Sequence, residues 1–444
     1  MNEQTDNWLR DTLEYSARTD VGMRRTNNQD SYYASPDAGA SRQRELGALF
    51  IVADGMGAHV AGELASKLAV VGVSDAYYQS DGRSPSDALR DAILAAHNTI
   101  RQRGEDPAYR DMGTTCDALA FKDGVAYIGH VGDSRVYRAR GRAIEQLTFD
   151  HSLVWEMKYY PTSHSAYRKL QLDNIPKNII TRSLGPTDDL VVDLEGPLAT
   201  LPGDVFLLCS DGLSGRVEDD ELGQILELFP PNDATEALIN LANLRGGPDN
   251  ITAIVVRVQG QSASSESPSH EVAEASEDVY ENRAPIPPRA RVVALVSALC
   301  VLGVPIVCVT PLARRALWLA LLATLALLFA ALAAWFARKS FVRVKKSPPP
   351  AKLGKGPYAR ASAAPTEKFA RTIGALCDEL CAALRADPQY EPDWTGVERA
   401  REQARLARES SNYAVSLRAD FTIINYMMRE VRKYAQKTQG HDRA

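Results

Sequence analysis

The stretch from Leu49 to Ala58, Leu-Phe-Ile-Val-Ala-Asp-Gly-Met-Gly-Ala, constrains the fold of this chain more than any other segment. Five apolar residues end in an acid followed by glycine, which predicts a buried strand that delivers the carboxylate of Asp54 to a tight turn. Two later apolar runs lead in a similar way to Asp133 and Asp211. We therefore expect distant segments of the chain to build one oxygen-lined site.

Composition narrows the classes of protein to which the chain can belong. With 444 residues, 45% hydrophobic and 24% charged, it is long enough for two or three globular units. A net charge of −5 argues against nucleic acid as a partner. None of the six cysteines forms a CxxC pair, which argues against a thiolate zinc site. A disulfide framework is not expected in a chain of this size. The first ten residues lack the apolar core of a signal peptide.

Residues 12–259 alternate short apolar runs with turn residues and helical segments. Helical periodicity predicts helices at 63–78, 84–100, 219–228 and 233–243. Strands are expected at 115–121, 125–130, 136–139 and 251–258, and Lys122-Asp123-Gly124 predicts a hairpin turn between the first two. Mostly non-parallel strands with helices in pairs indicate an α+β layered fold for this domain, not a doubly wound one.

The middle of the chain predicts a membrane anchor. Residues 260–290 are rich in Ser, Glu and Pro, which is typical of a disordered linker. Within 291–338, the stretches 292–309 and 316–337 are almost entirely apolar, and the second reaches about 33 Å as a helix, enough for a hydrocarbon core. Basic flanks predict a hairpin in the cell membrane with both ends in the cytoplasm. A single span by the second stretch is the alternative.

The last part of the chain shows no readable chemistry. Residues 339–364 form a basic, Pro-rich linker, and its stretch from 345 to 358 is expected to contact acidic membrane lipids. In the helical C-terminal region, 365–440, apolar residues recur at helical spacing over 367–386 and 397–436. This pattern predicts a small helical unit or an oligomerising helix pair.

Carboxylates in turn or strand-end contexts make up the candidate site. They are Asp30, Asp54, Asp133, Asp211 and Asp249. No matching set of His or Cys residues accompanies them, so a metal here would be hard and oxygen-bound, Mg²⁺ or Mn²⁺. Two such ions activate water and clamp a phosphoryl oxygen. Arg25, five residues before Asp30, has the forked donors that bind two phosphate oxygens.

The motifs around these acids resemble the ordered motifs of the metal-dependent protein phosphatase family, the type 2C serine/threonine class in its bacterial form. They are Arg25-Thr26-Asn27-Asn28-Gln29-Asp30, Val52-Ala53-Asp54-Gly55-Met56-Gly57, Gly113-Thr114-Thr115, His130-Val131-Gly132-Asp133-Ser134-Arg135, Ser210-Asp211-Gly212-Leu213 and Gly247-Pro248-Asp249-Asn250-Ile251-Thr252. The match spans about residues 14–258 in the right order and spacing. It implies a four-layer α-β-β-α sandwich with two metal ions at one end.

The resemblance also implies a role for each site residue. Asp54 would bridge both ions, and Gly55 would contribute its carbonyl oxygen. Asp211 and Asp249 would hold one ion, and Asp133 with Asp211 a third, weaker one. Asp30 would orient metal-bound water, and Arg25 would bind the substrate phosphate. The implied reaction is direct attack of a metal-bridging hydroxide on phosphoserine or phosphothreonine, with Mn²⁺ or Mg²⁺ as cofactor.

Three positions depart from the family pattern. Gln29 stands where the family has glutamate, from which we expect weaker metal affinity. Met56 stands where eukaryotic members carry a histidine proposed as general acid, and methionine cannot donate a proton. Ala58 replaces a glycine.

Several other residues are expected to be structural. The histidines at 59, 130 and 151 are expected to make structural hydrogen bonds, because no helical HxxxH spacing links them. Trp155 belongs to an aromatic segment from 152 to 178, which we expect to pack onto the domain; docking of a protein substrate is the alternative.

Taken together, these features predict a membrane-tethered cytoplasmic phosphatase. Its partners would be phosphorylated proteins and a cognate serine/threonine kinase, whose signalling it would reverse. The alternative is a weakly active or inactive phosphatase-like module that serves as a membrane-bound phosphoprotein scaffold.

Overall fold

The computed structural model describes residues 13–34, 46–57, 60–159, 179–260, 353–387, 389–390 and 392–441, the last seven of these residues, Val60 and Tyr159 by backbone only. The chain divides into two compact units, one formed by Met1–Ser262 with Lys352–Ala444 and the other by Ala263–Ala351. All described residues belong to the first unit. Most of the predicted linker and both apolar stretches, 292–309 and 316–337, lie outside the described residues.

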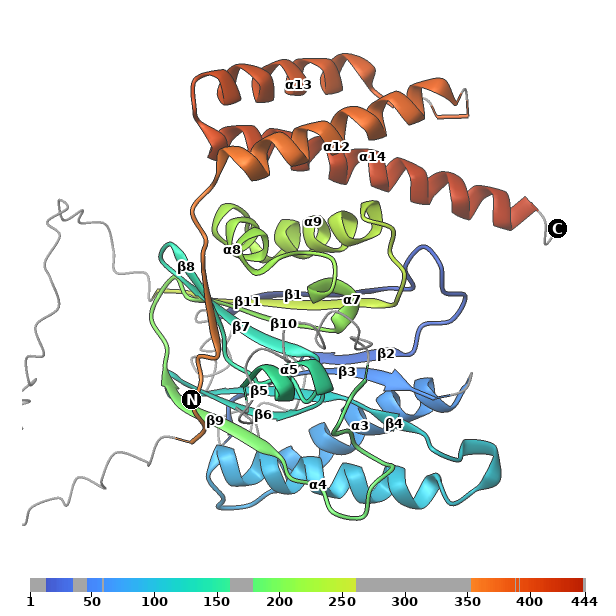
Figure 1. Cartoon of the computed structure of the whole chain (residues 1–444), viewed down its shortest axis with the longest axis vertical. Helices are drawn as coiled ribbons and strands as arrows, with labels where there is room; N and C mark the ends of the chain where they lie inside the picture. Colours follow the sequence, from blue (N-terminus) through green and yellow to red (C-terminus); the bar gives the residue numbers. More distant parts are fainter. Residues whose placement is uncertain are drawn as a thin grey trace, which may run out of the picture. The chain divides into compact units, whose positions relative to one another are not determined.

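Two antiparallel sheets form the centre of the first unit (Figure 1). One sheet has the order β1 (Leu13–Asp20), β11 (Ile251–Val258), β10 (Val205–Cys209), β7 (Arg135–Arg140), β8 (Ala143–Gln146) and β12 (Ala359–Ser362). The other has β2 (Asp30–Ala34), β3 (Ala48–Met56), β5 (Cys116–Lys122), β6 (Val125–Val131) and β9 (Asp193–Ala199), with β4 (Gly113–Thr114) paired to β3. Apolar residues such as Phe50, Leu119 and Phe206 fill the space between the sheets, each at most 1% exposed.

Helices cover the outer face of each sheet. The helices α3 (Val60–Gln79) and α4 (Pro85–Arg103) pack on the sheet that contains β3, and η1 (Pro107–Tyr109) follows them. The other sheet is covered by α7 (Asp211–Ser214), α8 (Asp219–Leu228) and α9 (Pro231–Leu244). The short helix α5 (Leu153–Tyr159) follows β8 in the chain. The predicted four-layer α-β-β-α sandwich is confirmed.

Local signals account for several element boundaries. Ser84 caps α4, because its hydroxyl accepts a hydrogen bond from the backbone N–H of Asp87 at 3.2 Å. Asp123 and Gly124 both have positive φ, 50° and 75°, which matches the twist of the β5–β6 hairpin. The predicted helix 219–228 and strand 251–258 have the same bounds in the structure.

The C-terminal region packs against the phosphatase-like sandwich as an additional layer. It contains β12, α12 (Glu367–Ala386), α13 (Trp394–Glu409) and α14 (Tyr413–His441), and α14 lies on α9 (Figure 1). Phe421 of α14 makes an edge-to-face contact with Phe229, with ring centroids 5.7 Å apart. Asn240 of α9 donates a hydrogen bond to Asn425 at 2.8 Å. The apolar faces of these helices therefore belong to the core of the sandwich's helical layer.

Two sequence predictions for this region differ from the structure. The predicted linker 339–364 contains β12, because the edge of β8 offers free backbone groups to a four-residue segment without apolar periodicity. The predicted helix 397–436 is two helices, since Ser411 has a φ of 60° and the side chain of Asn412 accepts a hydrogen bond from Val415 N at 3.3 Å.

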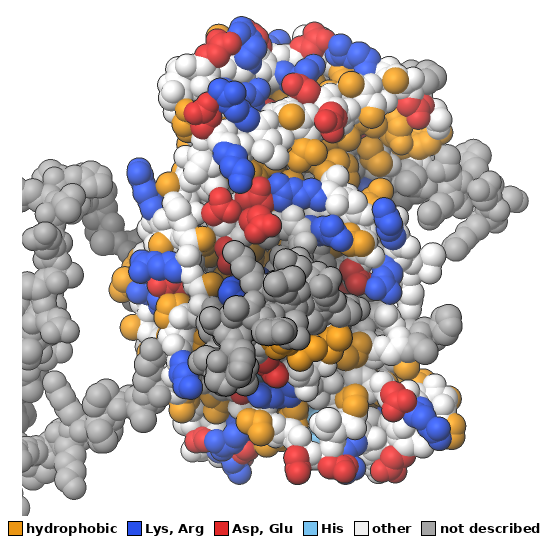
Figure 2. Space-filling view, in the orientation of Figure 1, with side chains coloured by type: hydrophobic (Ala, Val, Ile, Leu, Met, Phe, Trp, Pro, Cys, Tyr) orange, Lys and Arg blue, Asp and Glu red, His pale blue; other side chains and the backbone are white. Residues whose placement is uncertain are grey.

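The predicted multi-pass localisation in the cell membrane is corrected by the structure. Within the described ranges, no helix is long and apolar enough to cross a membrane. The described C-terminal helices instead carry charged side chains of both signs on their exposed faces, as Figure 2 shows over this region. Arg405 forms an ion pair with Glu402 within α13, and Arg385 of α12 forms one with Glu398 of α13.

Candidate active site

Asp30 and Asp54 lie opposite each other on neighbouring strands. Asp30 begins β2 and pairs in register with Asp54 of β3. One carboxylate oxygen of Asp30, Oδ2, accepts hydrogen bonds from the hydroxyls of Ser210 and Thr252, both at 2.7 Å. These two residues come from β10's end and from β11 of the other sheet. Asp30 thus joins the two sheets at the end of the sandwich where the predicted acids meet.

The Asp54-Gly55 pair is held tightly from its backbone. The N–H of Asp54 donates to Thr115 Oγ1 at 2.9 Å, and the carbonyl of Asp54 accepts from the hydroxyl of Thr114 at 2.9 Å. A Cβ atom added to Gly55 would stand 2.1 Å from the carbonyl oxygen of Gly62 in α3. Only glycine fits this close approach of strand and helix.

Asp133 lies in the turn between β6 and β7. Gly132 before it has a φ of +118°, and an added Cβ would meet Thr115 at 2.5 Å. His151 holds Gly132 on both sides, since the N–H of Gly132 donates to His151 Nδ1 at 3.0 Å and the N–H of His151 donates to the carbonyl of Gly132 at 2.8 Å. Arg135 after the turn donates three hydrogen bonds to the carboxylate of Asp150. The turn is therefore fixed by Asp150 and His151, which follow β8 in the chain.

Asp211 and Asp249 complete the set. Asp211 is the first residue of α7, directly after β10, and Asp249 lies in the turn before β11. Asp249 Oδ2 accepts a hydrogen bond from Arg25 Nη2 at 2.8 Å, and both side chains are accessible to solvent. The predicted phosphate-binding arginine is thus paired with a predicted metal ligand in this structure.

The electrostatics of the site show that the acids converge. Burial raises the pKa of Asp54 well above its usual range, and the charges of Asp30, Asp211, Asp133 and Asp249 raise it further. Burial and neighbouring carboxylates also raise the pKa of Asp30 and of Asp133 to about 7. The pKa of Asp211 is raised for the same reasons, although its hydrogen bond to Asp54 acts in the opposite direction. Carboxylates from five separate segments therefore share one low-dielectric site.

This donor set fits hard divalent cations. Oδ1 of Asp30 and Oδ1 of Asp133 are buried and have no hydrogen-bond partner among the described residues. A divalent cation would satisfy such oxygens and remove the repulsion among the carboxylates. No three acidic, histidine or cysteine side chains of the described part enclose a metal ion as they stand. The Asp54–Asp211 and Arg25–Asp249 contacts show where side chains would have to separate for metal binding.

His130 and His151 make structural hydrogen bonds, as predicted. His130 is fully buried between the carboxylate of Asp117, 2.6 Å from Nδ1, and the carbonyl of Phe149, 2.7 Å from Nε2. Burial alone would lower the pKa of His130, but the charge and hydrogen bond of Asp117, the hydrogen bond to Phe149 and the charge of Asp150 together raise it. Burial lowers the pKa of His151 to about 4, so this ring is neutral and Nε2–H donates to Asp193 at 3.0 Å.

Three residues of the quoted motifs support the site in ways that the sequence did not reveal. Ser210 and Thr252 orient Asp30, as described above. Asn250 is 4% exposed and binds the loop before β2: its Oδ1 accepts from the N–H of Gln29 at 2.8 Å, and its Nδ2 donates to the carbonyls of Val21 and Asn27 at 2.9 Å. The sequence signal that could have indicated this supporting role is their position in the same motifs as the predicted ligands Asp211 and Asp249.

Other sequence expectations concern residues near the site. Gln29 donates weakly from Nε2 to the carbonyl of Gly57 at 3.4 Å, and its expected effect on metal affinity stays a prediction. Met56 lies opposite Gly113 at the end of β3. Trp155 packs at right angles to Phe149 with ring centroids 5.6 Å apart, which agrees with the packing role. His59 and Ala58 lie outside the described residues.

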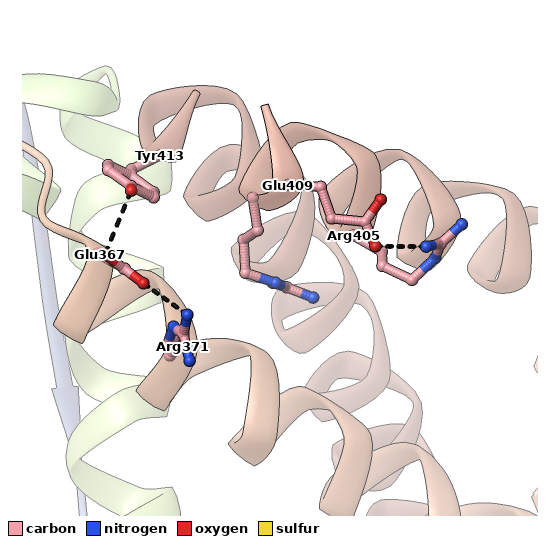
Figure 3. Close-up of a pocket in the computed structure, with 6 residues that line it drawn as sticks. Glu367, Arg371, Arg405, Glu409 and Tyr413 are labelled. Carbon is pink, nitrogen blue, oxygen red and sulfur yellow. Dashed lines mark hydrogen bonds and ion pairs between the residues drawn. The ribbon is translucent and has the colours of Figure 1, made fainter. Parts of the chain in front are cut away.

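A pocket lies between the C-terminal helices, away from the acidic residues described above (Figure 3). It is lined by Glu367, Arg371, Arg405, Arg408, Glu409 and Tyr413. The arginines that line it already have carboxylate partners: Arg371 pairs with Glu367 and Arg405 with Glu409 (Figure 3), and Arg408 pairs with Asp420. These internal ion pairs make it a structural junction of the helices α12, α13 and α14.

Comparison with known proteins identifies the family. A sequence profile described as protein phosphatase 2C matches residues 24–242. Protein phosphatase PhpP of Streptococcus pneumoniae is 37% identical over 261 residues, which cover 56% of this chain and 100% of PhpP. The chain belongs to the protein phosphatase 2C family. It is a protein serine/threonine phosphatase of this type, as the sequence predicted.

Further proteins to which this phosphatase 2C chain is similar are also named serine/threonine protein phosphatases. The serine/threonine protein phosphatase PstP of Mycobacterium tuberculosis is 33% identical over 249 residues, which cover 55% of this chain and 45% of PstP. Among solved structures, the catalytic domain of PstP in complex with two manganese ions is 31% identical and covers 56% of this chain and 99% of that chain, with a TM-score of 0.46. These matches leave almost half of the present chain without a counterpart.

Proposed function

We propose that this protein phosphatase 2C member hydrolyses phosphoserine and phosphothreonine in proteins with two divalent ions, Mn²⁺ or Mg²⁺. The observation that carries the proposal is the convergence of five buried or half-buried carboxylates, four of which, Asp30, Asp54, Asp133 and Asp211, have pKa values raised by burial and by the charges of neighbouring carboxylates. Such a cluster is costly unless cations neutralise it. Its cost in the metal-free protein is a reason to infer that the site is built for cations.

Each acid has a place in the proposed metal site. Asp54 would bridge both ions, with the carbonyl of Gly55 as a further ligand. Asp211 and Asp249 would hold one ion, and Asp133 with Asp211 would hold a third, weaker one. When bound, the ions supply a nucleophilic water at neutral pH and positive charge for the phosphoryl oxygens.

Asp30 and Arg25 would act on water and substrate. Ser210 and Thr252 fix Oδ2 of Asp30, which leaves Oδ1 free of hydrogen bonds from described residues and able to accept one from a water molecule. Arg25 is half exposed and offers a forked set of donors, so a phosphate on a protein surface can reach it. A cation held by Asp249 would compete with Arg25 for this carboxylate, and the guanidinium would then be available to the phosphate.

The proposed physiological role is to reverse the action of a serine/threonine kinase on phosphorylated proteins. Family membership and the names of the relatives support this role. The accessible position of Arg25 is consistent with a substrate that is itself a folded protein or an extended peptide.

Turnover by the full-length protein tests the proposal. With Mn²⁺, it should hydrolyse p-nitrophenyl phosphate and a phosphothreonine peptide, and Asp211→Asn should reduce both rates at least about 100-fold because a metal ligand is lost. Asp188→Asn, at a surface acid 91% exposed, is the matched control and should retain the wild-type rate. An inactive wild-type protein would favour the scaffold alternative, and an active Asp211→Asn variant would contradict the assignment of this ligand.

A further inference from the structure

Residues 353–366, here called the strap, run along the edges of both sheets. Leu353 donates a backbone hydrogen bond to Gly196 of β9 at 2.6 Å, in the sheet that contains β3. Residues 359–362 then form β12 and pair with β8 in the opposite sheet. Thr366 at the end of the strap donates from its N–H to Gln224 of α8 at 2.9 Å. The strap therefore ties together elements that the phosphatase domain contributes from separate layers.

A buried carboxylate anchors the middle of the strap. Glu195 on β9 is 4% exposed and accepts hydrogen bonds from the N–H groups of Lys355 and Gly356, both at 3.2 Å. It also accepts a hydrogen bond from the hydroxyl of Tyr358 at 2.6 Å. Charge-assisted hydrogen bonds to a buried carboxylate are among the stronger polar contacts in a protein. Tyr358 is thus held in a fixed orientation.

From Tyr358, two chains of contacts lead to the turn that carries Asp133. The first passes through aromatic rings: Tyr358 packs on Phe149 at 5.5 Å, Phe149 packs on Trp155 at 5.6 Å, and the guanidinium of Arg135 lies 5.4 Å from the centre of the Trp155 ring. Arg135 is two residues after Asp133. This chain therefore ends at the C-terminal side of the turn.

The second chain of contacts is polar. The N–H of Tyr358 donates to the carbonyl of Gln146 at 2.8 Å, and the buried side chain of Gln146 donates to Asp150 at 2.7 Å. Asp150 holds the guanidinium of Arg135 by three hydrogen bonds of 2.7 to 3.1 Å. Next to Asp150, His151 holds Gly132 at the N-terminal side of the turn, as described above. Both sides of Asp133 therefore depend on the segment 146–151 against which the strap packs.

We propose that Tyr358 is a positioning residue for Asp133, so that the C-terminal strap sets the affinity of the active site for the metal ion that Asp133 would hold. The inference rests on the proposed role of Asp133 as a metal ligand. Tyr358 itself does not touch substrate or the reacting atoms. It restricts the motion of Phe149, Trp155 and the 146–151 segment, and the Asp133 turn is held by that segment.

The test compares metal dependence in full-length variants. Tyr358→Ala removes the ring and the hydroxyl, and we expect the Mn²⁺ concentration at half-maximal turnover to rise on the order of 5- to 10-fold, the factor that an aromatic contact pair can supply. Turnover at saturating Mn²⁺ should stay within about 2-fold of wild type. Mn²⁺ binding measured directly by calorimetry should weaken in parallel. Tyr358→Phe keeps the ring but loses the hydroxyl bond to Glu195, so it should raise the Mn²⁺ midpoint about 2- to 3-fold, less than Tyr358→Ala.

Two further variants make the result decisive. Tyr413→Ala removes a C-terminal tyrosine outside the strap, whose hydroxyl donates a hydrogen bond to Glu367 at 3.4 Å, and it should leave the Mn²⁺ midpoint unchanged. Glu195→Gln weakens the anchor without creating a cavity, so it decides the question if Tyr358→Ala does not fold, and it should raise the midpoint about 2- to 3-fold.

The outcomes separate the inference from the proposed function. Mn²⁺ midpoints within 2-fold of wild type for both Tyr358→Ala and Glu195→Gln would overturn the inference, as would an equal rise in Tyr413→Ala. A variant that loses thermal stability with an unchanged midpoint would show a merely structural role for the strap. A wild-type protein without metal-dependent turnover would instead refute the proposed function.

Discussion

Neutralising one carboxylate of the active site should stabilise the metal-free protein. Asp133 is 8% exposed, and its Oδ1 has no hydrogen-bond partner among the described residues. Burial, with the charges of Asp211 and Asp150, raises its pKa to about 7 from an ordinary 3.8. Asp133→Asn removes the charge while keeping nearly the same shape. The variant should therefore unfold at a higher urea concentration than the wild-type protein in EDTA at pH 8.

The sign and size follow from proton binding. The unfolded chain loses the Asp133 proton near pH 3.8 and the folded protein near pH 7, so the wild-type protein loses stability as the pH rises between these values. The full difference corresponds to an upper bound of about 4 kcal/mol at pH 8. The buried amide of asparagine still lacks some hydrogen bonds, so we expect a net gain of about 1 to 3 kcal/mol in the free energy of unfolding.

Urea unfolding of both proteins at pH 5 and pH 8 measures this effect. The gain should shrink at pH 5, where Asp133 of the folded wild-type protein is largely protonated. Saturating Mn²⁺ should reverse the order, because the ions bind only the folded state and bind wild type more tightly. Asp123→Asn, in the exposed β5–β6 hairpin turn, is the control and should change stability by less than about 0.5 kcal/mol.

Two results would refute this reasoning. If Asp133→Asn were less stable than wild type at pH 8 in EDTA, the carboxylate would not carry the inferred cost. If the gain were the same at pH 5 and pH 8, its origin would not be the titration of Asp133.

Two further predictions concern the loop before β2. Arg25→Lys should lower kcat/KM for a phosphothreonine peptide about 10- to 100-fold, because lysine lacks the forked donors. Calorimetry should show Mn²⁺ binding at least as tight as in wild type, since the guanidinium no longer occupies Asp249. An unchanged kcat/KM would argue against phosphate binding by Arg25. Asn250→Ala should lower the free energy of unfolding, measured with urea, by about 2 to 4 kcal/mol, because it leaves the N–H of Gln29 and two carbonyls of the loop without their hydrogen-bond partner. The exposed control Asn232→Ala should lower it by less than about 1 kcal/mol. Equal losses in the two asparagine variants would contradict the bridging role of Asn250.

The sequence by itself determined the elements whose signals are local. Helical periodicity and end signals predicted α8 and α12 with their observed bounds. A run of mostly β-branched apolar residues likewise predicted the strand β11. The repeated strand-then-acid pattern also predicted that Asp54, Asp133 and Asp211 belong to one site. Such patterns are legible because burial of one face and the geometry of a turn depend on residues only a few positions apart.

Tertiary structure alone decided which residues support that site. Ser210 and Thr252 reach Asp30 from positions 180 and 222 residues later in the sequence. The strap gives a second example. Its strand β12 has four residues without apolar periodicity, so its sequence resembles a linker. Yet the hydroxyl of Tyr358 donates a hydrogen bond to Glu195, 163 residues earlier in the sequence. A strand at a sheet edge is stabilised by backbone pairing, and backbone pairing leaves no mark in the side-chain pattern until the partner edge is known.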